Sequence, residues 1–225
     1  MSEFNIFVAT DEHIAYVDVI LETIADAARV RGTGIAKRSP EYILRKIEER
    51  KAIIALQGET FAGFCYIETW GHEKFVANSG LIVADQFRGH GLAKAIKGKA
   101  FELSRTRFPQ AKIFGLTTGL AVMKINSELG YRPVTFSELT DDDHFWKGCQ
   151  SCVNYDILVR TDRKHCLCTG MLFDPVWEQK RQDVARKNGK VAERLANLKQ
   201  TLFKGKKKMN NASSNNSWSK LTALF

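Results

Sequence analysis

The chain has 225 residues, enough to bury one hydrophobic core, and its hydrophobic fraction of 44% and charged fraction of 26% are those of a globular protein. No apolar run reaches membrane-spanning length, and the N-terminus lacks the basic-then-apolar pattern of a signal peptide. Five cysteines, an odd number, indicate reduced thiols rather than a disulfide framework. We therefore expect a cytoplasmic protein without a membrane span.

The net charge of +9 is concentrated at the C-terminal end. Residues 1–174 carry 22 Lys and Arg against 22 Asp and Glu, whereas residues 175–225 carry 12 against 3. A globular part without net charge argues against a nucleic-acid-binding protein. Contact with nucleic acid or another anionic surface would therefore involve the basic tail, residues 175–225.

The first part of the chain predicts strands and helices separated by turns rich in Gly, Pro and Asp. In order, we expect a strand over 5–9, a helix from 10 or 11 to about 29, a helix opened by Ser39 and Pro40, a hairpin of strands 52–56 and 61–70, and a strand over 75–83.

The segment after that strand, residues 84–93, says the most about function. It leads through a polar turn into Arg88-Gly89-His90-Gly91-Leu92-Ala93, where a helix begins. The free N–H groups of this helix N-terminus and the helix dipole can hold an anion such as a pyrophosphate. Gly89 and Gly91 lack the Cβ atoms that would keep phosphate oxygens away, and Arg88 adds a permanent charge. The absence of Gly-Lys-Ser/Thr excludes a P-loop, and the absence of Gly-x-Gly-x-x-Gly argues against a dinucleotide loop.

Further elements follow this loop. We expect a helix that buries Leu92, Ile96, Ala100 and Leu103 and turns Lys94, Lys97 and Lys99 outward, a strand over 112–116, a helix over 120–129 stopped by Gly130, a strand over 131–134, a helical turn at 141–143, and strands over 153–160 and 166–172. The order β-α-α-β-β-β-α-β-α-β-β argues for an α/β or α+β fold with a mixed central sheet.

Arg88-x-x-Gly91-x-Ala93 resembles the pyrophosphate loop of the GNAT superfamily of N-acyltransferases, and the element order is also that of this family. The resemblance covers residues 4–160. It implies a mixed, mostly antiparallel sheet flanked by helices, here followed by a C-terminal hairpin and a basic helical tail. It also implies acetyl-CoA or succinyl-CoA as co-substrate, bound by Leu81, Ile82, Val83, Arg88, Gly89, His90, Gly91, Leu92 and Ala93.

Four segments, 31–37, 77–83, 116–126 and 166–172, resemble a GNAT subgroup of N-acylglutamate synthase-like proteins linked to arginine biosynthesis. The reaction implied is transfer of an acetyl or succinyl group from its CoA ester to the α-amine of glutamate. Two other functions stay open: a protein N-acetyltransferase, for which the tail could be a targeting element, and a CoA-binding regulatory module without catalysis.

The catalytic residues are where the sequence departs from the family. The family's Tyr-x-x-x-Gly-Phe reads Asn126-Ser-Glu-Leu-Gly-Tyr131 here, so Asn126 stands where the resemblance implies a Tyr proton donor. Ser127 is another candidate donor, and Glu68 and Glu73 are the nearest candidates for a base. At each position a surface or capping role competes with the catalytic one.

The substrate side is predicted at the connection between the first two helices. Arg31, Lys37 and Arg38 with two nearby glycines suit an acceptor that bears carboxylates, so we expect a small amino acid as substrate. An ordinary solvated loop is the alternative.

The cysteines raise the question of a metal. Cys149, Cys152, Cys166 and Cys168 have spacings that resemble a four-Cys zinc site. A tight hairpin of 153–160 and 164–172 would, however, hold Cys152 and Cys166 about 15 Å apart along the strand. We therefore expect no metal, with free buried thiols here and Cys65 in the core.

The predicted organisation is a domain over 1–174 that includes the Cys-rich hairpin 149–172, a basic amphipathic helix over 175–209, and a disordered tail over 210–225. The apolar stripe of the helix could dock on the domain, pair with a second copy as a homodimer, or contact anionic lipid or nucleic acid; a solvated helix is favoured over these. The apolar stripe comprises Val184, Val191, Leu195, Leu198 and Leu202.

Overall fold

The computed structural model describes residues 4–32 and 37–213, and contacts divide the chain into two units that meet at Pro175 and Val176. The described residues of the first unit form one seven-stranded sheet. Its strands lie in the order β1 (Asn5–Val8), β2 (Ala52–Gln57), β3 (Thr60–Trp70), β4 (Phe75–Val83), β5 (Lys112–Thr117), β7 (Thr169–Phe173) and β6 (Arg132–Val134). Every neighbouring pair is antiparallel except β4 and β5. The predicted mixed, mostly antiparallel sheet is confirmed.

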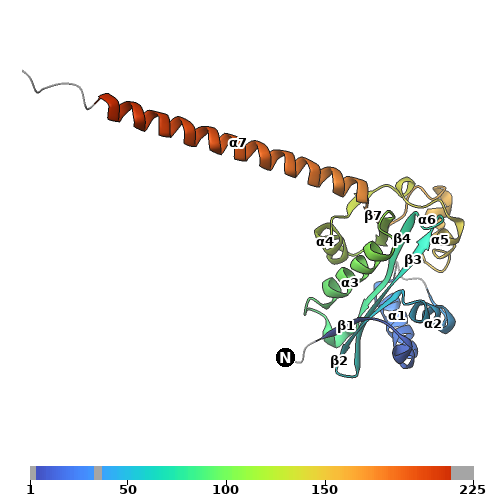
Figure 1. Cartoon of the computed structure of the whole chain (residues 1–225). Helices are drawn as coiled ribbons and strands as arrows, with labels where there is room; N and C mark the ends of the chain where they lie inside the picture. The colour runs from blue at the N-terminus through green and yellow to red at the C-terminus, as the bar shows by residue number, and fades with distance from the viewer. Residues whose placement is uncertain (1–3, 33–36, 214–225) are drawn as a thin grey trace, which may run out of the picture. The chain divides into compact units, whose positions relative to one another are not determined.

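Helices cover both faces of this sheet (Figure 1). One face carries α1 (Val17–Arg31), preceded by the 3-10 helix η1 (Asp11–Tyr16), and α2 (Pro40–Glu48). The other carries α3 (Leu92–Arg107) and α4 (Leu120–Glu128). Ser39 caps α2 as its spacing predicts, since its hydroxyl accepts a hydrogen bond from the Tyr42 N–H. Apolar side chains form one core cluster on each face.

A bulge in β4 redirects the second half of this strand. Gly80 and Leu81 together oppose Cys65 of β3, so the register shifts by one residue. Gly80 has φ +66°, and a Cβ here would lie 2.5 Å from a ring atom of Tyr66. Only glycine meets both conditions.

The pairing of β4 with β5 ends before the bulge is reached. These parallel strands pair only over Phe75–Ala77 and Lys112–Phe114. The second half of β4 therefore presents main-chain N–H and C=O groups toward a gap rather than toward a neighbouring strand. The same parallel pair requires the crossover through α3, which brings that helix against β2, β3 and β4.

The predicted strand over 153–160 is wrong. Residues Tyr155–Arg160 form the short helix α6. Val153 and Val159 are 73% and 57% exposed while Leu158 is buried, so the alternate apolar side chains of this segment do not share a buried face, as they would in a strand. The Thr161 hydroxyl donates a hydrogen bond to the Ile157 carbonyl and closes the helix. The predicted Cys-rich hairpin therefore does not form, and β7 pairs instead with β5 and β6.

Lys97 also departs from prediction, because it does not face outward with Lys94 and Lys99. It is only 2% exposed. Its position three residues before Ala100 and seven before Ser104 puts it on the buried face of α3. The three smaller helices η2 (Asp85–Phe87), η3 (Phe136–Glu138) and α5 (Asp143–Lys147) complete the described part of the first unit.

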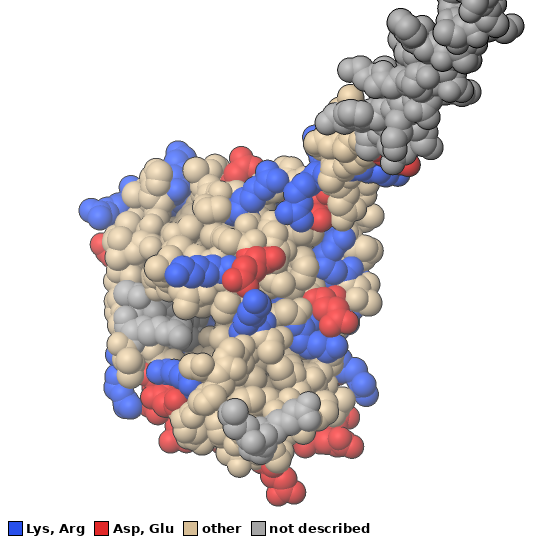
Figure 2. All heavy atoms as spheres, turned by 90° about the vertical axis from the view of Figure 1, so that its left-hand side faces the viewer, with Lys and Arg blue, Asp and Glu red and all other residues tan. Residues whose placement is uncertain are grey.

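The described part of the second unit belongs to the helix α7 (Pro175–Ser213), which continues past the predicted end at residue 209. Val184, Val191 and Leu195 of the predicted stripe are 54–56% exposed. The side chains of Leu198 and Leu202, and residues 214–225 of the predicted tail, lie outside the described residues. In the described part of the chain, no helix combines the length and apolar character needed to cross a bilayer. Figure 2 shows Lys and Arg interspersed with Asp and Glu over the first unit, as their equal numbers in residues 1–174 lead one to expect.

Candidate active site

A cavity of about 250 Å³ lies at the gap between β4 and β5 and reaches the α1–α2 side of the sheet. Its walls come from elements far apart in the sequence. They include Arg38 and Tyr42, then Tyr66, Glu68 and Trp70 of β3, residues 77–82 of β4, residues 114–117 of β5, Lys97 of α3 and Asn126 of α4.

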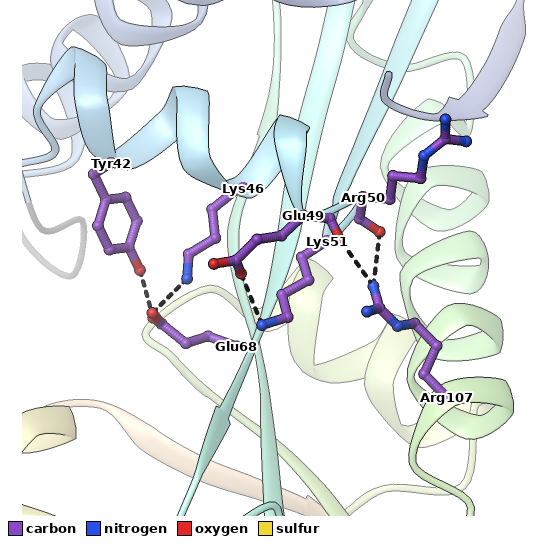
Figure 3. A network of polar contacts seen from close by, with 7 residues as sticks. All are labelled: Tyr42, Lys46, Glu49, Arg50, Lys51, Glu68 and Arg107. Atoms are coloured by element: carbon purple, nitrogen blue, oxygen red, sulfur yellow. Dashed lines mark hydrogen bonds and ion pairs between the residues drawn. The ribbon is translucent and has the colours of Figure 1, made fainter. Parts of the chain in front are cut away.

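Glu68 is held in place at this cavity by two partners from α2 (Figure 3). Its Oε1 lies 2.5 Å from the Lys46 Nζ, and its other oxygen accepts a short hydrogen bond from the Tyr42 hydroxyl. Lys46 is 5% exposed, so this ion pair is shielded from water. Burial, followed by the neighbouring Tyr66 and Glu68, raises the pKa of Tyr42, which keeps its hydroxyl a donor. A carboxylate fixed in this way can accept a proton from an amine in the cavity.

A second set of polar contacts, farther from the cavity, fixes the end of α2. Lys51 pairs with Glu49 at 2.7 Å, and the Arg107 guanidinium donates to the carbonyls of Glu49 and Arg50 at 3.0 and 3.1 Å (Figure 3). Arg50 has φ +52° at this turn. Arg107 thus ties the α2–β2 turn to α3, on the opposite face of the sheet.

Arg38 is the positive group on the α2 side of the cavity. Its Nε donates to the Tyr66 hydroxyl at 2.8 Å, and its guanidinium carbon lies 4.9 Å from the centre of the Tyr42 ring. Burial alone would lower the pKa of Arg38, but Tyr66, Tyr42 and Glu68 outweigh it and the pKa is raised. A guanidinium stacked in this way is oriented to bind a carboxylate.

The other predicted cations of this connection are placed differently. Lys37 is exposed and its side chain does not line the cavity; its N–H donates to the Ser151 hydroxyl at 3.3 Å. Arg31 is the last residue of α1, and its side chain lies outside the described residues, as do residues 33–36. Arg38 is therefore the predicted substrate-binding residue that the structure brings to the cavity.

Lys97 enters the cavity from the α3 side. Burial lowers its pKa to about 8, although Cys65 acts in the opposite direction. Its Nζ lies 5.3 Å from the centre of the Tyr131 ring. Nearby, Asn78 donates to the Ser104 hydroxyl and accepts from the Tyr131 hydroxyl, both at 2.8 Å. Sequence reasoning missed Lys97, yet its spacing to Ala100 and Ser104 could have identified it.

Two buried polar atoms at this cavity have no hydrogen-bond partner within the described residues: Oδ1 of Asn126 and Nε1 of Trp70. Because an unpaired buried polar atom costs free energy, both are ready to bind a ligand. Asn126 is 1% exposed, whereas its neighbour Ser127 is exposed and does not line the cavity. Glu73 is also exposed, in the β3–β4 turn with φ +64°.

The Gly-rich loop forms the entry to α3. Gly89 and Gly91 have φ +83° and +76°, which explains why glycine occupies both positions. Gly91 is the N-cap of α3, and no side chain caps the helix there. The first N–H groups of α3 therefore remain available for an anion. Arg88 pairs with Asp85 at 2.6 Å, while the side chain of Leu92 is buried so that only its N–H can contribute.

The four cysteines of residues 149–168 line a second cavity of about 70 Å³ together with Tyr155 and Leu158. No hairpin separates these cysteines, contrary to the prediction, since α6 replaces one of its strands. Burial, reinforced by the neighbouring cysteines, raises the pKa of Cys149 to about 11 and that of Cys168 to about 12. Across residues 4–32 and 37–213, no group of three or more His, Cys, Asp or Glu is arranged to hold a metal ion.

The sequence of residues 21–121, from α1 to the start of α4, matches the model described as the acetyltransferase (GNAT) family. This range contains Arg38, Glu68, the Gly-rich loop and Lys97. The comparison with curated proteins found no match.

Solved structures share the fold at low sequence identity. N-acetylglutamate synthase from Neisseria gonorrhoeae, complexed with coenzyme A and N-acetyl-glutamate, superposes with a TM-score of 0.55 at 15% identity over 77% of this chain and 35% of its own. Rv2747 from Mycobacterium tuberculosis, complexed with CoA, superposes with a TM-score of 0.54 at 14% identity, and the match covers 76% of this chain and 98% of Rv2747. Diaminobutyrate acetyltransferase from Paenibacillus lautus, complexed with L-2,4-diaminobutyric acid and coenzyme A, has a TM-score of 0.53 at 12% identity. The match covers 78% of this chain and 96% of that acetyltransferase.

The present chain thus spans about a third of the Neisseria synthase. At these identities the similarity is one of fold. The match to the acetyltransferase (GNAT) family is that of residues 21–121.

Proposed function

We propose that the protein is an acyl-CoA-dependent N-acyltransferase that acylates the amine of a small anionic amino acid, with glutamate as the acceptor. The observation that carries this proposal is the single cavity that joins the open edge of β4 to Arg38 and Glu68. It provides a place for a thioester on one side and for an amino acid on the other. A glutamate acceptor would put the reaction in arginine biosynthesis.

The donor would bind along β4 and the Gly-rich loop. After the bulge at Gly80, no strand pairs with residues 81–83 on the β5 side, so the amides of pantetheine can pair with this main chain as an added strand. The Val83 carbonyl accepts a long hydrogen bond from the Arg88 Nε, at 3.4 Å, which the donor would replace. The pyrophosphate would bind the uncapped N–H groups at the start of α3, with Arg88 adding charge. Coenzyme A in the structures of similar fold supports this arrangement.

The acceptor would bind on the α2 side of the cavity. The Arg38 guanidinium and the unpaired Trp70 Nε1 are donors suited to carboxylates. Glu68 would hold the acceptor's ammonium and remove a proton from it, because only the neutral amine attacks a thioester. The contacts of Glu68 with Lys46 and Tyr42 fix its carboxylate, so it can also position the amine for attack.

Attack on the thioester carbonyl forms a tetrahedral oxyanion, which main-chain N–H groups of β4 beside the gap can stabilise. Collapse then breaks the C–S bond and releases the CoA thiolate. Asn126 lines the cavity, but its unpaired Oδ1 is an acceptor and its amide supplies no proton at neutral pH. The thiolate would therefore be protonated by the ammonium formed in the attack or by water.

The test is a steady-state screen of the full chain with acetyl-CoA and succinyl-CoA, following thiol release and identifying products by mass spectrometry. Transfer to free glutamate and little transfer to peptides would support the proposal. Transfer to peptides or protein N-termini alone would instead favour a protein N-acetyltransferase. Tight CoA binding without turnover on a broad acceptor panel would favour a regulatory module.

A further inference from the structure

Lys97 is a buried cation at the cavity for which the transfer reaction described above has no use. Glu68 is the one carboxylate among the described residues that line this cavity, and it is already paired with Lys46 and Tyr42. Within the described chain, no carboxylate forms an ion pair with Lys97. An ammonium group kept from water in this way is costly unless an anion arrives to pair with it.

The position of Lys97 indicates where such an anion would come from. The last pair between β4 and β5 is Ala77 with Phe114, and the next residues are Asn78 and Gly115. A Cβ on Gly115 would lie 3.8 Å from the Lys97 Nζ and 3.3 Å from the Asn78 carbonyl oxygen. Because Gly115 has no side chain, the amine lies open at the closed end of the gap.

The neighbours of Lys97 do not remove the need for an anion. Asn78 and Tyr131 hydrogen-bond each other, and the Tyr131 ring offers the amine a cation–π contact at 5.3 Å. The lowered pKa of Lys97, about 8, reflects the remaining cost of burial. A carboxylate next to the amine would offset this cost, whereas the methyl group of an acetyl donor would not.

We propose that the acyl donor carries a terminal carboxylate, as succinyl-CoA does, and that Lys97 at the closed end of the β4–β5 gap binds this carboxylate. The inference rests on the proposed function, since it concerns the donor of the same transfer. A thioester held against β4 would direct its acyl chain toward the closed end of the gap. Lys97 thereby selects a dicarboxylic acyl group over a monocarboxylic one.

The test compares succinyl-CoA, butyryl-CoA and acetyl-CoA as donors to glutamate. Butyryl-CoA is the decisive comparison, because its acyl chain has the same number of carbons and a methyl group in place of the carboxylate. The wild-type protein should favour succinyl-CoA over butyryl-CoA in kcat/KM. Lys97→Met should lower kcat/KM for succinyl-CoA about 30-fold or more, while acetyl-CoA and butyryl-CoA change by less than about threefold.

Lys99→Met is the matched control, because Lys99 lies on the same helix, has a side chain that is 40% exposed, and pairs only with Glu102 among the described residues. It should leave the kinetics of all three donors unchanged. An equal fall in kcat for every donor in Lys97→Met would overturn the inference and assign Lys97 to the chemical step. A wild-type preference for acetyl-CoA, with no effect of Lys97→Met, would overturn it as well.

Failure of the proposed function has a different signature. If no donor releases thiol with any amino acid, the transferase proposal fails, and equilibrium binding of the same CoA esters still tests Lys97. Tighter binding of succinyl-CoA than of butyryl-CoA to the wild-type protein, lost in Lys97→Met, would support the carboxylate contact. Equal binding of the two esters would refute it.

Discussion

The Lys46 ammonium lies 2.5 Å from Oε1 of Glu68, and the ion pair joins α2 to β3 at the wall of the cavity. The ion pair bears on activity through Glu68 and on stability through Lys46. The Glu68 carboxylate faces the cavity, where it can act on an amine, whereas Lys46 is buried behind it and depends on Glu68 for its counter-charge. Loss of Glu68 should therefore affect both activity and stability, through different groups.

Glu68→Gln should lower kcat for acyl transfer by about 100-fold or more, because an amide cannot accept the acceptor's proton. The KM for acyl-CoA should stay nearly unchanged, since Glu68 lies on the acceptor side. Steady-state kinetics with varied acceptor and donor measure both. Glu73→Gln is the control, as Glu73 is exposed in the β3–β4 turn. A larger effect of Glu73→Gln than of Glu68→Gln would exchange their roles.

The stability effect of the same substitution tests the ion pair. Removing one partner of a buried pair typically costs about 3–5 kcal/mol, because the other charge is left uncompensated. We expect Glu68→Gln to lower the free energy of unfolding by a few kcal/mol, at the lower end because Glu68 is partly exposed. Adding Lys46→Met should recover most of the stability but none of the activity, as chemical denaturation of the double variant would measure. If the double variant stays as unstable as Glu68→Gln, the ion pair is not the cause.

Arg38→Lys should raise the KM for the amino acid about 10-fold or more and leave the KM for acyl-CoA unchanged. Lysine keeps the charge but loses the stacked, forked geometry that Arg38 has between Tyr42 and Tyr66. Lys37→Ala is the comparison, because its exposed side chain does not line the cavity. If Lys37→Ala raised the acceptor KM more than Arg38→Lys, the acceptor would bind outside the cavity.

Arg88→Ala should raise the KM for acyl-CoA several-fold and leave the KM for the acceptor unchanged, because a contact to phosphate is lost. Its present partner, Asp85, competes for the guanidinium, so Asp85→Ala should lower the KM for acyl-CoA slightly. The two variants together check that the effect comes from the charge of Arg88. An unchanged donor KM in Arg88→Ala would count against the loop as the pyrophosphate site.

Local patterns were enough to predict the sheet, the hairpin of β2 and β3, and the loop at Gly89 and Gly91. In each of these the signal lies within a few neighbouring residues, such as a two-residue turn or a Pro at the first position of a helix. The order of the elements then restricts the topology to few arrangements.

The errors arose where tertiary contacts override such patterns. The alternating Val and Ile of 153–159 are typical of a strand, but packing of Leu158 and the bond of Thr161 to Ile157 stabilise a helix there. Lys97 was expected in solvent because lysine is rarely buried. Its spacing to Ala100 and Ser104 puts it on the buried face of α3 instead, where it lines the cavity at the gap between β4 and β5.

Lys97 also makes a prediction about stability against pH. Its pKa is about 8 in the folded protein and 10.5 for the free side chain, so between these values the unfolded chain holds the proton that the folded protein has released. The contribution of Lys97 to stability should therefore rise with pH from about 8 to 10.5, by about 3 kcal/mol in total, and stay constant below pH 8. Of the titratable groups that face Lys97, the buried Tyr131 has a raised pKa and Cys65 a pKa near 11. Cys65 contributes with the opposite sign, since its folded thiol keeps its proton longer than the unfolded one.

Urea unfolding of the wild-type protein and of Lys97→Met at pH 7, 8, 9 and 10 measures the effect of Lys97, which includes its lowering of the Cys65 pKa. The difference in unfolding free energy should shift toward the wild type as the pH rises, and a difference that stays constant over this range would show that Lys97 is not buried as a charged group.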